Sequence, residues 1–218
     1  VNYLSLNEIT PSHYVEEFFL QDIVKSADIN MIQTYLNTSI NALGKDGSEI
    51  STMVQLLKKI IIPTLYVNAQ NTSSATDLTK TNGKTADWIH SLGENVWNKV
   101  NETENDESYE NDLFRVELMQ LTSVMVEYYP NIVSDWKKDI IKFNWNNISL
   151  EDTITKQVAY VSIAYFIKNF ETPAKLVIQV FVALLKANQT EVKSLVRQSL
   201  DLLAPKLNER LGTDTEWL

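Results

Sequence analysis

The stretch TEVKSLVRQSLDLLAPKL, from Thr190 to Leu207, decides the fold class of this chain of 218 residues. Its apolar side chains recur about every three to four residues, which is the spacing of one face of an α-helix. Pro205 is expected to end this helix, because proline lacks the backbone N–H that an interior helical position needs. The stretch predicts one amphipathic helix whose apolar face needs a cover, formed by Val192, Leu195, Val196, Leu200 and Leu203.

Helices of similar pattern begin at regular intervals before this one. The predicted starts lie near residues 112, 150 and 190, a period of roughly 40 residues that is typical of HEAT and armadillo repeats. Ser149 with Asp152 predicts a capping box at the second start, and Thr172-Pro173 begins the partner helix. Neighbouring repeats bury each other's apolar faces. The chain is therefore predicted to be all-α, an α-solenoid of stacked antiparallel helical hairpins.

The predicted organisation is one continuous solenoid fragment. N-terminal helical hairpins occupy residues 1–68, with a kink or a short break after Ile61 because Pro63 interrupts the pattern. Pro130 is expected to end the helix that begins near Asp112. The remaining predicted segments are a polar loop at 69–84, a helix with an acidic linker at 85–111, and HEAT-like repeats over 112–218, divided at about 112–148, 149–188 and 189–218.

The composition limits the classes of function. A net charge of −9 argues against direct binding of nucleic acid, which requires clustered Lys and Arg. The absence of cysteine removes disulfides and thiolate zinc sites. The sequence also contains no run of about eighteen apolar residues, so it predicts no membrane span. His13 and His90 are the two histidines, and they lie far apart in the sequence with no cysteine available to either. We therefore expect no enzyme, no cofactor and no metal site.

Two lysine pairs are candidates for binding a partner. Lys58-Lys59 and Lys137-Lys138, with Trp136 beside the second pair, offer cationic and aromatic side chains for the rim of a groove. Such a rim suits an acidic, hydrophobic peptide, although the net charge of −9 opposes it. A tryptophan at helical spacing is more often a core residue than an interface anchor. Partner binding by these five residues is thus a prediction with a purely structural alternative.

A short signature in the opening stretch resembles the second helix of HEAT repeats. Glu191, the pair Val196-Arg197 and the small Ser199 carry it. The arginine of that signature commonly makes ordered polar contacts with adjacent repeats, so we expect Arg197 to contact neighbouring helices. The run YFIKNFETPAKLVIQVFVALLKANQTEVKSLVRQSLDLLAPKLNERLG, from Tyr165 to Gly212, resembles the transformation/transcription domain-associated protein family, including its fungal members.

This resemblance implies a scaffold. Members of the family are very large helical-repeat proteins that end in a kinase-like domain without catalytic residues. They are shared nuclear subunits of SAGA and NuA-type histone acetyltransferase complexes, and they receive transcription activators. The implied role is a non-catalytic segment of such a pseudokinase subunit, with the rest of the same chain, other complex subunits and activators as partners. A karyopherin-like or other HEAT-repeat adaptor is the alternative, because the repeat period fits both classes.

Overall fold

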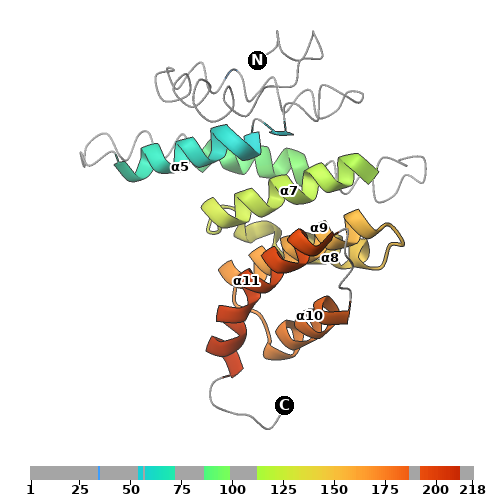
Figure 1. Cartoon of the computed structure of the whole chain (residues 1–218). Helices are drawn as coiled ribbons and strands as arrows, with labels where there is room; N and C mark the ends of the chain where they lie inside the picture. The colour runs from blue at the N-terminus through green and yellow to red at the C-terminus, as the bar shows by residue number, and fades with distance from the viewer. Residues whose placement is uncertain are drawn as a thin grey trace. The chain divides into compact units, whose positions relative to one another are not determined.

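The computed structural model describes Thr34 and residues 54–55, 57–71, 86–98, 112–186 and 192–211. Every regular element within these ranges is helical, as the all-α prediction requires (Figure 1). Contacts divide the chain into two compact units, Val1–Trp136 and Lys137–Leu218. In the described part, no helix has the length and apolar character needed to cross a membrane. The predicted loop at 69–84 and the acidic linker lie largely outside the described residues.

The first unit contains a change of helix type at the predicted position. A π-helix, η2, spans Leu57–Ile61 and α5 follows over Ile62–Asn71. The backbone stays helical from Leu57 to Asn71, so no break follows Ile61, and the helix changes there from π-helix to α-helix. Pro63 lies in the first turn of α5, where a missing backbone N–H is tolerated. Because α5 continues to Asn71, the polar segment begins later than predicted.

Three further helices of the first unit lie among the described residues. A helix covers residues 86–98, α7 spans Asp112–Tyr128, and the short 3₁₀ helix η3 spans Val133–Trp136. Both η2 and α5 contact α7. The helix α7 stops just before Pro130, as predicted. The largest fully buried side chains of this unit are Leu57, Ile62, Ile89, Leu92, Leu118, Met119, Leu121 and Met125.

The second unit is built from four longer helices. They are α8 (Lys137–Ile148), α9 (Thr153–Asn169), α10 (Ala174–Lys186) and α11 (Lys193–Leu211). The helix α9 packs against both α8 and α11. The helix α10 packs mainly against α11 and makes far fewer contacts with α9. The repeat boundaries at 148 and 188 stay a prediction, because these contacts link each helix to more than one neighbour. The central apolar cluster comprises Tyr160, Ile163, Ala164, Ile167, Val177, Val180, Leu184 and Leu203.

Two predicted helix boundaries are wrong in this unit. Asp152, and not Ser149, caps α9: its side chain accepts a hydrogen bond from the Thr155 backbone N at 2.6 Å. The cap is therefore local to the first turn, and the predicted capping box does not form. Pro205 lies inside α11 and does not end it. In Figure 1 the ribbon of α11 changes direction partway along, which is the usual response of a helix to an internal proline.

Candidate functional site

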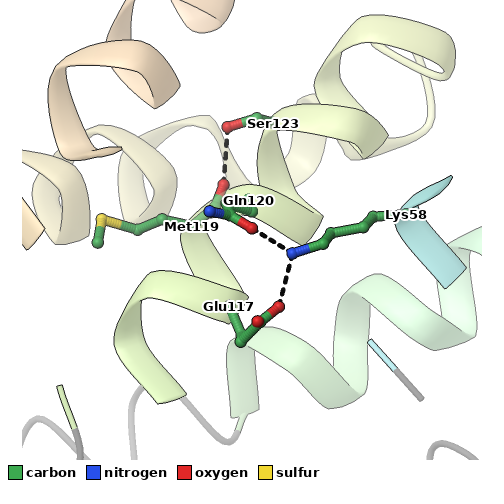
Figure 2. Close-up of polar contacts among 5 residues, drawn as sticks. All are labelled: Lys58, Glu117, Met119, Gln120 and Ser123. Atoms are coloured by element: carbon green, nitrogen blue, oxygen red, sulfur yellow. Dashed lines mark hydrogen bonds and ion pairs between the residues drawn. The ribbon is translucent and has the colours of Figure 1, made fainter. Parts of the chain in front are cut away.

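Lys58, one of the predicted partner-binding residues, is part of an internal polar network. Its Nζ donates to Glu117 Oε2 at 2.7 Å and also to Gln120 Oε1 (Figure 2). The side chains of Lys58 and Glu117 are only 11% and 9% exposed. Glu117 and Gln120 share one face of α7, so the ammonium from η2 joins the two helices. Lys58 is therefore committed to the packing of the first unit and is withdrawn as a partner-binding candidate.

Ser123, one residue of α7 beside the network, forms its hydrogen bond within that helix. Ser123 Oγ donates to the Met119 carbonyl at 2.7 Å, one turn back along the helix. The sequence analysis missed Glu117 and Gln120 as functional positions. Their signal was a lysine within the apolar run of η2 and an acidic residue beside the apolar positions of α7, since a buried charge needs a partner. Spacing alone did not say which carboxylate would meet Lys58.

Trp136, the aromatic member of the predicted surface, packs against the helix over 86–98. Its ring lies 4.8 Å from the His90 ring, measured between centroids. A Cβ placed on Gly93 would come within 2.6 Å of the Trp136 indole. Asp135 adds a carboxylate oxygen 3.9 Å from His90 Nε2. Trp136 is thus a packing residue of its unit, and Gly93 supplies the space that its ring needs.

The other lysines differ in their surroundings. Lys137 Nζ lies 4.6 Å from the centre of the Phe170 ring, so its charge rests on an aromatic face. Lys138 is exposed on α8, and Lys59 is exposed on η2. Of the five predicted partner-binding residues, Lys59, Lys137 and Lys138 lie at the surface, Lys58 is internal, and Trp136 is partly buried. Their role in binding stays a prediction.

The HEAT-like signature residues fall on α11 with different exposures. Val196 and Ser199 are buried, and Ser199 Oγ donates to the Leu195 carbonyl at 3.0 Å. Arg197 is 82% exposed, and its Nε lies 3.7 Å from Asp201 Oδ2 one turn along the same helix. This ion pair of Arg197 lies within α11, and the predicted contact of Arg197 with neighbouring helices is not seen among the described residues. Glu191 lies outside them.

Within the described ranges, no cluster of metal ligands occurs. No group of three or more His, Asp or Glu residues among them could hold a metal ion. His13 lies outside the described ranges. Burial raises the pKa of the Tyr129 hydroxyl well above its ordinary value, and Tyr66, whose ring centre lies 5.8 Å away, raises it further. That hydroxyl is therefore neutral at physiological pH.

One cavity lies within the second unit. Its volume is about 530 Å³, and it opens where α9 ends, α10 begins and α11 passes. Lys206 Nζ and Glu209 Oε2 form an ion pair at 2.6 Å on its α11 side. Positive and negative side chains line the cavity in equal number, so it has no strong preference for a charged ligand. The lining residues are Lys168, Asn169, Phe170, Glu171, Thr172, Ala174, Lys206 and Glu209.

Comparison with known proteins identifies the family. A family model described as the Tra1 HEAT repeat ring region matches residues 1–218. The chain is 36% identical over 216 residues to the SAGA complex/NuA4 acetyltransferase complex subunit TRA1 of Saccharomyces cerevisiae, covering 97% of this chain and 6% of that protein. It is 31% identical over 212 residues to the probable transcription-associated protein 1 of Dictyostelium discoideum, covering 95% of this chain and 4% of that protein.

A third relative extends the similarity to vertebrates. The human transformation/transcription domain-associated protein is 29% identical over 110 residues, which cover 46% of this chain and 3% of that protein. No solved structure matches the chain. The chain spans no more than 6% of the length of these relatives. The match over all 218 residues and the helical structure agree with the resemblance seen in the sequence, and the chain belongs to the Tra1 family, within its HEAT repeat ring region.

Proposed function

We propose that this chain is a non-catalytic scaffold segment of a large pseudokinase subunit shared by SAGA and NuA4 histone acetyltransferase complexes, acting in the nucleus. The observation that carries the proposal is the 36% identity to the Saccharomyces cerevisiae TRA1 subunit over 97% of the chain. The SAGA complex/NuA4 acetyltransferase complex subunit Tra1 of Schizosaccharomyces pombe is 36% identical over 130 residues, which cover 60% of this chain and 4% of that protein. Family membership also removes the karyopherin-like alternative, which rested on the repeat period alone.

The packing of the described residues supports a structural role. Charged and aromatic side chains that suggested binding serve internal contacts instead: Lys58 pairs with Glu117, and Trp136 packs on Gly93. A segment whose polar groups join its own helices holds a fixed shape, which is what a scaffold must supply to its neighbours. The proposed partners are the rest of the same large chain and the other subunits of these complexes.

The test is a segment exchange in the yeast relative. The matched segment of TRA1 is replaced by this chain, and SAGA and NuA4 are purified through another subunit. We expect both complexes to retain their full set of subunits. A second exchange carrying Lys58→Ala is expected to lose subunits, while Lys138→Ala is the matched surface control. Complexes that assemble equally well with no segment at all would refute a scaffold role.

Direct binding of activators is a second candidate function, and the distribution of charge favours it. Residues 1–136 carry a net charge of −11 and residues 137–218 carry +2, which together give the −9 of the chain. The second unit is therefore the part that suits an acidic peptide. Reversing Lys137 and Lys138 to Glu in the exchanged segment should leave assembly intact and lower the affinity of the complex for a labelled acidic activation peptide. Unchanged affinity would count against direct binding.

A further inference from the structure

The helix α8 has one buried face and one exposed face, and it packs against α9. Its buried residues are Ile140, Phe143, Asn144 and Asn147. On the opposite side, Lys138, Lys142 and Trp145 are exposed. These three residues follow one another at helical spacing, so they form one stripe along the exposed face, the α8 stripe.

Trp145 is the unusual member of this stripe. Its side chain is 44% exposed, whereas tryptophan is highly buried in most folded proteins. The other large apolar side chains that are exposed among the described residues are aliphatic: Val67, Ile154, Val182 and Leu185. Tryptophan is also among the residues that most often carry the binding energy of an interface. An exposed indole is therefore suited to anchor a partner.

The charge of the α8 stripe is opposite to that of the whole chain. Lys138 and Lys142 lie one turn apart and are exposed, although the net charge of the chain is −9. The acidic residue of α8, Asp139, is half-buried, and the exposed Glu151 lies beyond the end of the helix. Two ammonium groups beside an indole complement a peptide that carries both carboxylates and apolar side chains.

Lys137 belongs to a different side of α8. It precedes Lys138 by one residue, which turns it about 100° around the helix axis. Its Nζ lies 4.6 Å from the centre of the Phe170 ring. Because its charge already rests on an aromatic face, Lys137 contributes less to a partner than Lys138 does.

We propose that the α8 stripe binds an acidic peptide with apolar side chains, and that Trp145 is its anchor. The inference rests on the second proposed function, direct binding of activators, and it names the surface responsible. The two lysines attract and orient the peptide, and the indole covers its apolar side chains. All three groups come from one helix face, so the surface needs no change in the packing of α8.

Fluorescence anisotropy of a labelled peptide made of Asp, Glu, Phe and Leu tests the proposal on the 218-residue chain. We expect Trp145→Ala to weaken binding about tenfold or more, as at an aromatic hot spot, and Trp145→Phe to weaken it less. Lys138→Glu and Lys142→Glu should each weaken binding several-fold. The matched control is Lys175→Glu, which makes the same change at an exposed lysine of α10 and should leave the affinity nearly unchanged.

Lys137→Glu separates the stripe from a general effect of charge. This variant should weaken binding less than Lys138→Glu, because Lys137 lies on Phe170. Equal losses for Lys137→Glu, Lys138→Glu and Lys175→Glu would overturn the proposal, since the net charge and not the stripe would then set the affinity. Circular dichroism of each variant checks that the helices remain.

Control ligands separate this surface from its alternatives. A peptide with Asn and Gln in place of its acidic residues, and one with Ala in place of Phe and Leu, should each bind more weakly. Single-stranded DNA of equal charge that bound more tightly than the peptide would overturn the proposal. If no peptide binds the original chain, the second proposed function fails together with the inference. A peptide that binds regardless of changes in the α8 stripe overturns the inference alone.

Discussion

The ammonium of Lys58 lies 2.7 Å from the carboxylate of Glu117, although 59 positions separate the two residues in the sequence. Both side chains are about nine-tenths buried. The pair links a π-helical turn to α7, and Gln120 completes the coordination of the ammonium. A buried ion pair of this kind specifies which helices meet, because any other arrangement would leave a charge buried without a partner.

Breaking this pair from one side should be costly. We expect Lys58→Met to lower the free energy of unfolding by about 3–5 kcal/mol, because Glu117 would stay buried without its counter-charge. The double variant Lys58→Met/Glu117→Leu should recover most of that loss, since an apolar pair needs no charge compensation. Urea denaturation measures both, and Lys138→Met is the exposed control. A double variant as unstable as the single one would show that the pair is not the cause.

The space beside Gly93 gives a second prediction. Gly93→Ala adds a methyl group where the Trp136 ring would stand 2.6 Å away. Overpacking costs about 1–3 kcal/mol, and the better helix propensity of alanine returns about 1 kcal/mol. We expect net destabilisation by thermal unfolding. In a Trp136→Ala background the same change should become stabilising, and Glu94→Ala on the same helix serves as control. Identical effects in both backgrounds would contradict the contact.

The Asp152 cap predicts a pH dependence. The neighbouring polar groups of Thr155, first its side chain and then its backbone N–H, lower the pKa of Asp152 below its ordinary value. The ionised carboxylate therefore stabilises the folded state above the pKa of the unfolded chain, and this contribution disappears as pH falls through the folded pKa. Asp152→Ala should cost about 1 kcal/mol at neutral pH.

Asp152→Asn separates the cap from its charge. Asparagine accepts the same backbone hydrogen bond but does not titrate, so this variant should keep most of the stability at neutral pH and lose part of the acid sensitivity. Unfolding by urea at neutral and at mildly acidic pH makes the comparison. If Asp152→Asn and the original chain lose stability in parallel on acidification, other carboxylates are responsible.

Replacing Pro205 should stabilise α11. The proline lies inside the helix, is exposed, and removes one backbone hydrogen bond. Because an interior proline is about 3 kcal/mol less favourable than alanine, Pro205→Ala should raise the thermal midpoint. Removing the proline also makes the unfolded chain more flexible, which offsets a smaller part of that stabilisation. Ala204→Gly is expected to lower it. A lower midpoint for Pro205→Ala would mean that the bend of α11 is needed for its packing.

Much of the fold could be predicted from the sequence, because its signals act over a few residues. The end of α7 before Pro130 and the start of α10 after Pro173 both follow from proline chemistry. At Pro63 the predicted interruption is a change from π-helix to α-helix and not a break. The same chemistry failed at Pro205, where packing of α11 against α9 and α10 outweighs the loss of one hydrogen bond. At α9, Asp152 sits closer to the helix start and caps it in place of Ser149.

The sequence by itself determined the class of helices, the family and the absence of cysteine chemistry, since periodicity and residue types are local properties. Only the tertiary structure decided what the charged and aromatic candidates do. Lys58 was predicted to be a surface cation, and its side chain is instead buried in an internal ion pair. The Trp136 ring packs against Gly93. Which carboxylate meets a lysine, and which glycine faces a ring, depends on how distant helices align, and no local pattern encodes that alignment.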